Sequence, residues 1–140
     1  MGWRGVMRTP LLAVGLTLLG TGCTTGSSPS AQARDYVRQA CVNKPAVPGA
    51  TATEHDASSI TTAYRNSAAL AAKAAALDPS WIDLSRAYGF LADAFGEFAQ
   101  ILTLKPSDPQ AKARFASLNA STTQASTWES LIRTDCLRAS

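Results

Sequence analysis

The chain has 140 residues, of which 46% are hydrophobic and 16% charged, which is enough for one ordinary domain. Its net charge of +3 includes Arg4 and Arg8 at the N-terminus; without them the charges nearly balance, so no basic surface for nucleic acid is expected. Three cysteines and one histidine leave little material for a metal site.

The first element in chain order is a targeting signal. Arg4 and Arg8 precede an apolar stretch over 11–19, and small residues follow it up to Cys23. A basic start, an apolar run of about ten residues and small residues after it are typical of a secretory signal peptide. A membrane-spanning helix would need roughly 20 apolar residues. We therefore expect export without a transmembrane helix.

The end of this signal carries a motif. The sequence LGTGC at 19–23 resembles the lipobox of bacterial lipoproteins, although Gly20 stands where that family usually has Leu. In the family, the cysteine sulfur receives a diacylglycerol and the peptide is cut just before the cysteine. The resemblance implies a signal peptide over 1–22 and a lipidated Cys23 that anchors the protein in the membrane. A plain secretory signal, cut nearby, is the alternative.

A polar segment follows the lipobox. Residues 24–30 include Gly, Ser and Thr but no charge and no large apolar side chain, so they cannot contribute to a core. We expect 23–30 to form a flexible tether in front of a domain over 31–140. An Ala-rich domain behind such a signal resembles the small helical lipoproteins of high-GC bacteria, a likeness that implies nothing about its task.

Two cysteines, Cys41 and Cys136, remain once Cys23 is assigned to lipid. Disulfides persist in exported proteins, and two cysteines allow one internal pairing. We predict a structural Cys41–Cys136 disulfide, because the CxxC spacing of redox-active pairs is absent. Two buried thiols that never meet are the alternative.

The domain is predicted to be all-α. Alanine is abundant and alternating strand patterns are missing. Ser30 and Asp56 are the expected N-caps of the first two helices, and Pro79 and Pro109 open the last two. The expected fold is an antiparallel bundle of three long helices plus a short N-terminal one, stapled by the disulfide. The predicted helices are 31–42, 57–77, 79–104 and 109–138.

The predicted third helix carries two parallel lines of residues. One line is an apolar seam, expected to pack inside the bundle, of Leu84, Tyr88, Leu91, Phe95, Phe98 and Leu102. A line of small residues, which includes Gly89 and Gly96, runs beside it. Small residues allow a neighbouring helix to pack closely. The alternative is a shallow binding groove at Gly89, Phe90 and Gly96. The fourth helix is expected to turn one face inward, with Phe115, Leu118, Thr122, Ala125, Trp128, Ile132 and Cys136 along it.

No catalytic or metal-binding pattern emerges. His55 is expected in a solvated loop, with no second histidine to complete a zinc site. Asp93 and Glu97 share a helix face, but we interpret them as solvated or as facing a cationic partner. Neither a nucleophile elbow nor a phosphate-binding glycine loop occurs. We therefore expect no enzyme activity, no cofactor and no bound metal.

The expected function is a non-catalytic one at the cell envelope. The sequence predicts a lipid-anchored protein on the extracytoplasmic side of the membrane, with a protein-binding or scaffolding role. The alternative is a carrier of a lipid or a hydrophobic small molecule, which would need a closed cavity of several hundred cubic ångströms.

Overall fold

The computed structural model describes residues 26, 28–45 and 51–140. The expected signal peptide, Cys23 and residues 24, 25 and 27 of the expected tether lie outside these residues. Every element in the described part is helical, so the all-α prediction is confirmed. The elements are α1 (Pro29–Val42), α2 (Glu54–Leu77), a short 3₁₀ turn η1 (Pro79–Trp81), α3 (Ile82–Leu102), α4 (Pro109–Ala120) and α5 (Thr122–Ala139).

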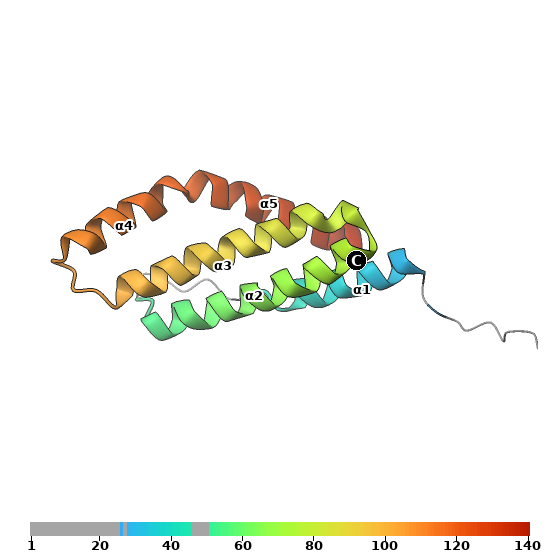
Figure 1. The fold of residues 1–140 in the computed structure, drawn as a ribbon, viewed down its shortest axis with the longest axis horizontal. Coiled ribbons are helices and arrows are strands. Elements are labelled where there is room, and N and C mark those ends of the chain that lie inside the picture. The colour runs from blue at the N-terminus through green and yellow to red at the C-terminus, as the bar shows by residue number, and fades with distance from the viewer. Residues whose placement is uncertain (1–25, 27, 46–50) are drawn as a thin grey trace, which may run out of the picture.

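An antiparallel pair of helices, α2 and α3, forms the centre of the domain (Figure 1). Helix α1 packs along α2, whereas α5 contacts both α3 and α1 and so closes the bundle. The core between them combines alanines, most of them from α1 and α2, with larger side chains from α1, α2, η1 and α3. Its members include Ala33, Val37, Ala40, Ile60, Tyr64, Ala71, Ala74, Trp81, Leu84, Tyr88 and Leu91.

The first two helices begin earlier than expected. Helix α1 is capped by Ser28, whose Oγ accepts a hydrogen bond from the Ala31 N–H at 3.2 Å, and not by Ser30. Pro29 therefore occupies the first turn, where its missing N–H costs nothing. Residues 29 and 30, assigned to the tether, belong to the helix.

The cap of α2 is Thr53 and not Asp56. The Thr53 hydroxyl accepts from the Asp56 N–H at 3.2 Å, and the Asp56 carboxylate accepts in return from the Thr53 N–H at 2.9 Å. This reciprocal arrangement is a capping box. The Thr53 N–H, followed by its hydroxyl, lowers the pKa of Asp56. Because the helix starts at Glu54, His55 lies exposed in its first turn and not in a loop.

The third predicted helix is shorter than expected. Asp78 accepts from the Ser80 N–H at 3.0 Å, as the Asp-Pro pattern indicated, but the first turn after it is the 3₁₀ turn η1. Helix α3 then begins at Ile82 and ends at Leu102, two residues before the expected end.

The fourth predicted helix is interrupted, and the expectation of one helix over 109–138 is wrong. It divides at Ser121 into α4 and α5. The Ser121 hydroxyl donates to the Leu118 carbonyl at 2.7 Å, and the Thr122 hydroxyl donates to the Asn119 carbonyl. Hydroxyls that bond nearby carbonyls compete with the helical ladder. The break lets α4 lie at an angle to α5 (Figure 1).

The break changes which residues face inward. Ala125 and Ile132 of α5 pack against the core, as expected. Phe115 of α4 is 49% exposed, contrary to the inward face predicted for it. Only Ala111 of α4 is buried. Helix α4 contacts only α3 and α5, and it is the most loosely packed α-helix of the described domain.

Candidate functional site

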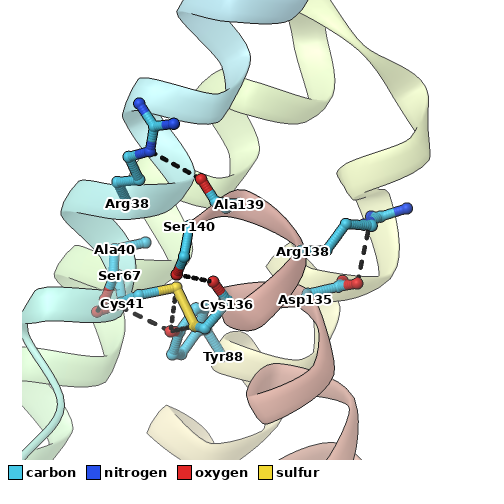
Figure 2. Close-up of a disulfide and its surroundings, with 10 residues drawn as sticks. All are labelled: Arg38, Ala40, Cys41, Ser67, Tyr88, Asp135, Cys136, Arg138, Ala139 and Ser140. Atoms are coloured by element: carbon cyan, nitrogen blue, oxygen red, sulfur yellow. Dashed lines mark hydrogen bonds and ion pairs between the residues drawn. A yellow bond between two sulfur atoms is a disulfide. The ribbon is translucent and has the colours of Figure 1, made fainter.

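The disulfide joins the end of α1 to the end of α5. Cys41 and Cys136, which are 95 positions apart, are bonded with their Cα atoms 5.8 Å apart (Figure 2). The predicted pairing is confirmed. Near the bridge, Arg38 Nε donates to the Ala139 carbonyl at 2.7 Å, which is a second link between the same two helices.

Tyr88 lies beneath the disulfide (Figure 2). Its hydroxyl is 3.6 Å from the Cys136 sulfur and donates to the Ala40 carbonyl at 3.4 Å. Ser67 Oγ donates to that carbonyl at 2.9 Å. Burial raises the pKa of Tyr88 to about 12, because the surrounding core disfavours a phenolate. These contacts link α1, α2, α3 and α5 around the disulfide, so we interpret the region as structural.

The three residues of the predicted groove lie at different places. A Cβ at Gly96 would meet Thr61 Cγ2 of α2 at 3.5 Å, an ordinary contact, whereas a Cβ at Gly89 would meet nothing within 4 Å. Phe90 is partly buried and packs against the core. Neither glycine is needed for a close approach of helix backbones. Of the three, Gly96 alone lines one of the two grooves described next.

A polar groove runs between the start of α2 and the end of α3. It has a volume of about 290 Å³ and includes Gly96 in its lining. Its lining includes the polar or charged side chains Glu54, Ser58, Thr61, Arg65 and Gln100.

An apolar groove lies where α3 faces the corner between α4 and α5. Its volume is about 200 Å³. Phenylalanine and leucine side chains line it from both sides, so that the corner at Ser121 opens a gap between apolar surfaces. The lining side chains include Leu91, Phe95 and Phe98 of α3, Phe115 and Leu118 of α4, and Ala125 of α5. We refer to these six residues as the apolar groove.

Sequence reasoning missed this groove. Phe95 and Phe98 belong to the apolar seam expected to pack inside the bundle, and Leu118 to the face expected to cover it. Because the helix breaks at Ser121, the two surfaces separate in part, and all three side chains are only partly buried. The signal in the sequence is the run of Ser and Thr at 121–123, which weakens a helix interior.

One carboxylate borders the apolar groove. Glu129 of α5 is the charged residue of its lining, and it makes no ion pair with the residues that the structure describes. Tyr64 lies behind Phe95, with their rings 5.6 Å apart. Burial, and then the negative charge of Glu129, raise the pKa of Tyr64.

The two carboxylates of α3, Asp93 and Glu97, do not form a common site. Glu97 accepts from Arg114 Nε at 2.6 Å and from Arg114 Nη2 at 3.0 Å, so it anchors α4 to α3. Arg114 also donates to Gln100 at 2.7 Å. Asp93 is exposed. Glu97 therefore faces a cation of this chain. The sequence alone did not decide between water and a cationic partner.

Two further features concern membranes and metals. Among residues 26, 28–45 and 51–140, no helix is long and apolar enough to cross a bilayer. Over the same residues, no group of three or more His, Cys, Asp or Glu side chains is placed to hold a metal ion.

Comparison with protein-family models, with curated proteins and with solved structures gives no match to this chain.

Proposed function

We propose that the protein is a lipid-anchored component of the cell envelope, and that its helical domain is a non-catalytic binding module for another protein. The observation that carries the binding role is the apolar groove between α3 and the α4–α5 corner.

The exposure of large apolar side chains supports a binding role. Phe115 is 49% exposed beside Leu118, on the helix that packs most loosely. Exposed apolar surface costs free energy in water, and burying it against a partner recovers about 25 cal/mol per Å². Apolar patches with polar rims commonly mark protein interfaces. Asn119, Ser121 and Thr122 supply such a rim.

The size of the groove favours a protein partner over a carried ligand. Its volume of about 200 Å³ lies below the roughly 300–1,000 Å³ of pockets that enclose small molecules. One or two apolar side chains fit it, whereas a whole lipid does not. A carrier role therefore stays the second candidate.

Support for the anchor comes from the sequence and from the start of α1. A basic stretch, an apolar run and a lipobox-like LGTGC precede Cys23. Helix α1 begins at Pro29, so five residues separate Cys23 from it. Extended, they reach at most about 18 Å. A lipid on Cys23 would therefore hold the domain close to the membrane surface, within reach of an envelope partner.

A photo-crosslinking experiment in intact cells tests the binding role. A benzophenone side chain in place of Phe115 lies in the apolar groove, and the same side chain in place of Ala72, exposed on α2, is the matched control. The proposal expects one protein adduct, identified by mass spectrometry, at Phe115 and not at Ala72. Phospholipid adducts at Phe115 would favour the carrier, and identical adducts at both positions would contradict a groove-specific role.

Metabolic labelling with a fatty-acid probe tests the anchor. Wild type is expected to be labelled and to fractionate with membranes, whereas Cys23→Ala is expected to be unlabelled. Equal labelling of the two proteins, or none in wild type, would contradict lipidation at Cys23.

A further inference from the structure

The apolar groove has the length of a short helix contact. Its floor on α3 extends from Leu91 to Phe98, which at 1.5 Å per residue is about 10 Å, or two helical turns. Amphipathic helices bind in grooves through side chains at i, i+3 or i+4, and i+7. Two turns accommodate two or three of these anchors, and the volume of about 200 Å³ accommodates their tips.

The helices around the groove present side chains, and no free backbone groups, to a partner. Helix α3 faces the corner between α4 and α5 (Figure 1), and side chains of all three helices line the groove. Their ladders satisfy their own backbone groups, so the groove offers side-chain surface and no free strand edge. A helix, whose backbone bonds are also internal, fits such a surface without leaving polar groups unpaired.

Charge then restricts the partner further. Glu129 is the charged residue of the groove lining, and no ion pair of the described residues includes it. A partner that covered Glu129 with apolar atoms would desolvate a carboxylate without compensation, which is costly. A Lys or Arg on the partner, placed to pair with Glu129, removes this penalty and fixes the register of docking.

We infer that the apolar groove binds an amphipathic helix of another protein, which inserts aromatic or aliphatic anchors between α3 and Phe115 and pairs a Lys or Arg with Glu129. The inference rests on the proposed binding function and specifies its partner.

Two model peptides test this chemistry on the purified full-length protein. Both are labelled, amidated, Ala-rich helices of about 15 residues, long enough to be partly helical in water. Both carry Leu anchors at i, i+4 and i+7, and they differ in one residue, a Lys or a Glu one turn beyond the last anchor. Fluorescence anisotropy measures their dissociation constants. The Lys peptide is expected to bind about fivefold more tightly, the scale of a partly exposed ion pair against a like-charge contact.

Variants of Glu129 locate the effect. Glu129→Gln is expected to abolish the preference, and Glu129→Lys to reverse it in favour of the Glu peptide. Glu129 is exposed, so both variants are expected to fold. Glu54→Gln, the same change at an exposed position in the polar groove, is the matched control and is expected to keep the fivefold preference.

Three results would overturn the inference: equal binding of the two peptides to wild type, a preference that survives in Glu129→Gln, or no binding of either peptide. Each would leave the proposed function standing if the benzophenone at Phe115 still captured one protein. Failure of that capture, with the charge preference intact, would instead contradict the proposed binding of a protein in the cell and retain the peptide chemistry of the groove.

Discussion

Arg38 of α1 and Ala139 of α5 meet across 101 positions of sequence, with Arg38 Nε donating to the Ala139 carbonyl at 2.7 Å. Ala139 itself is buried, with 1% of its surface exposed. Together with the Cys41–Cys136 bond, this contact fixes the end of α5 against α1. Because the Arg38–Ala139 hydrogen bond joins the same two helices, α5 is expected to stay docked on α1 when the disulfide is removed.

Removing the disulfide is expected to destabilise the domain without abolishing its fold. A crosslink across 95 positions restricts the unfolded chain by about 4.6 kcal/mol in the loop-entropy model. The double variant Cys41→Ser, Cys136→Ser is expected to lose up to that amount and to retain its helical circular dichroism. Chemical denaturation with and without reductant measures the loss.

The same experiment contains its own control. Reductant is expected to lower the denaturation midpoint of wild type and to leave the double variant unchanged. A wild-type midpoint that is insensitive to reductant, or alkylation of Cys41 and Cys136 before reduction, would contradict the bridge.

Tyr88 is expected to make the fold sensitive to alkaline pH. Its pKa is raised to about 12 by burial, from an ordinary value of 10.0. The folded state therefore holds the phenolic proton more tightly than the unfolded state, and stability falls as pH rises between these two values. Tyr88→Phe is expected to lessen this fall, and Tyr64, whose pKa is also raised, to account for part of what remains.

Denaturation midpoints measured across that pH range, for wild type and Tyr88→Phe, check this expectation. At neutral pH the variant is expected to lose less than about 1 kcal/mol, because Ser67 still donates to the Ala40 carbonyl. An equally steep alkaline loss in both proteins would contradict a role for Tyr88.

Much of the fold follows from patterns that act over one or two turns. The periodic residues Leu84, Tyr88 and Leu91 are buried, as the seam of α3 predicted. The Asp-Pro pairs at 78–79 and 108–109 mark helix starts, because the aspartate caps and the proline needs no hydrogen-bond partner. The disulfide was predicted from the two cysteines that remain once Cys23 is assigned to lipid, together with the expectation of export.

The apolar groove could not be predicted in the same way. It depends on the break at Ser121, where neither Gly nor Pro interrupts the sequence. Whether Ser or Thr hydroxyls bond the helix's own carbonyls or face water depends on tertiary packing as well as on local sequence. The apolar periodicity of 109–138 continues across the break, so it predicts one straight inner face. Phe115 is exposed because that face bends.

The glycines of α3 are expected to be replaceable, contrary to a close-packing role. A Cβ at Gly89 meets open space, and a Cβ at Gly96 makes ordinary contact with Thr61. Alanine favours the helix over glycine by about 0.5–1 kcal/mol. Gly89→Ala and Gly96→Ala are each expected to raise the melting temperature by a few degrees. A lower melting temperature for Gly96→Ala would indicate that α2 and α3 need the glycine to pack.

Substitutions of two phenylalanines in the apolar groove are expected to affect stability and binding to different extents. Phe95 packs against the core and its ring stacks on that of Tyr64 at 5.6 Å. Phe95→Ala is expected to cost about 3 kcal/mol, near the lower limit for a buried phenylalanine because the ring is only partly buried. Phe115 is 49% exposed, and Phe115→Ala is expected to cost less than about 1 kcal/mol.

Phe115 is expected to matter more for binding of the Lys peptide than for stability, because a partner would bury the exposed half of its ring. Phe115→Ala is expected to weaken that binding about tenfold, the scale of an anchoring aromatic residue. Thermal melts and anisotropy titrations of both variants measure the two effects. If Phe115→Ala bound the peptide as wild type does, the apolar contact would have to lie elsewhere on the domain.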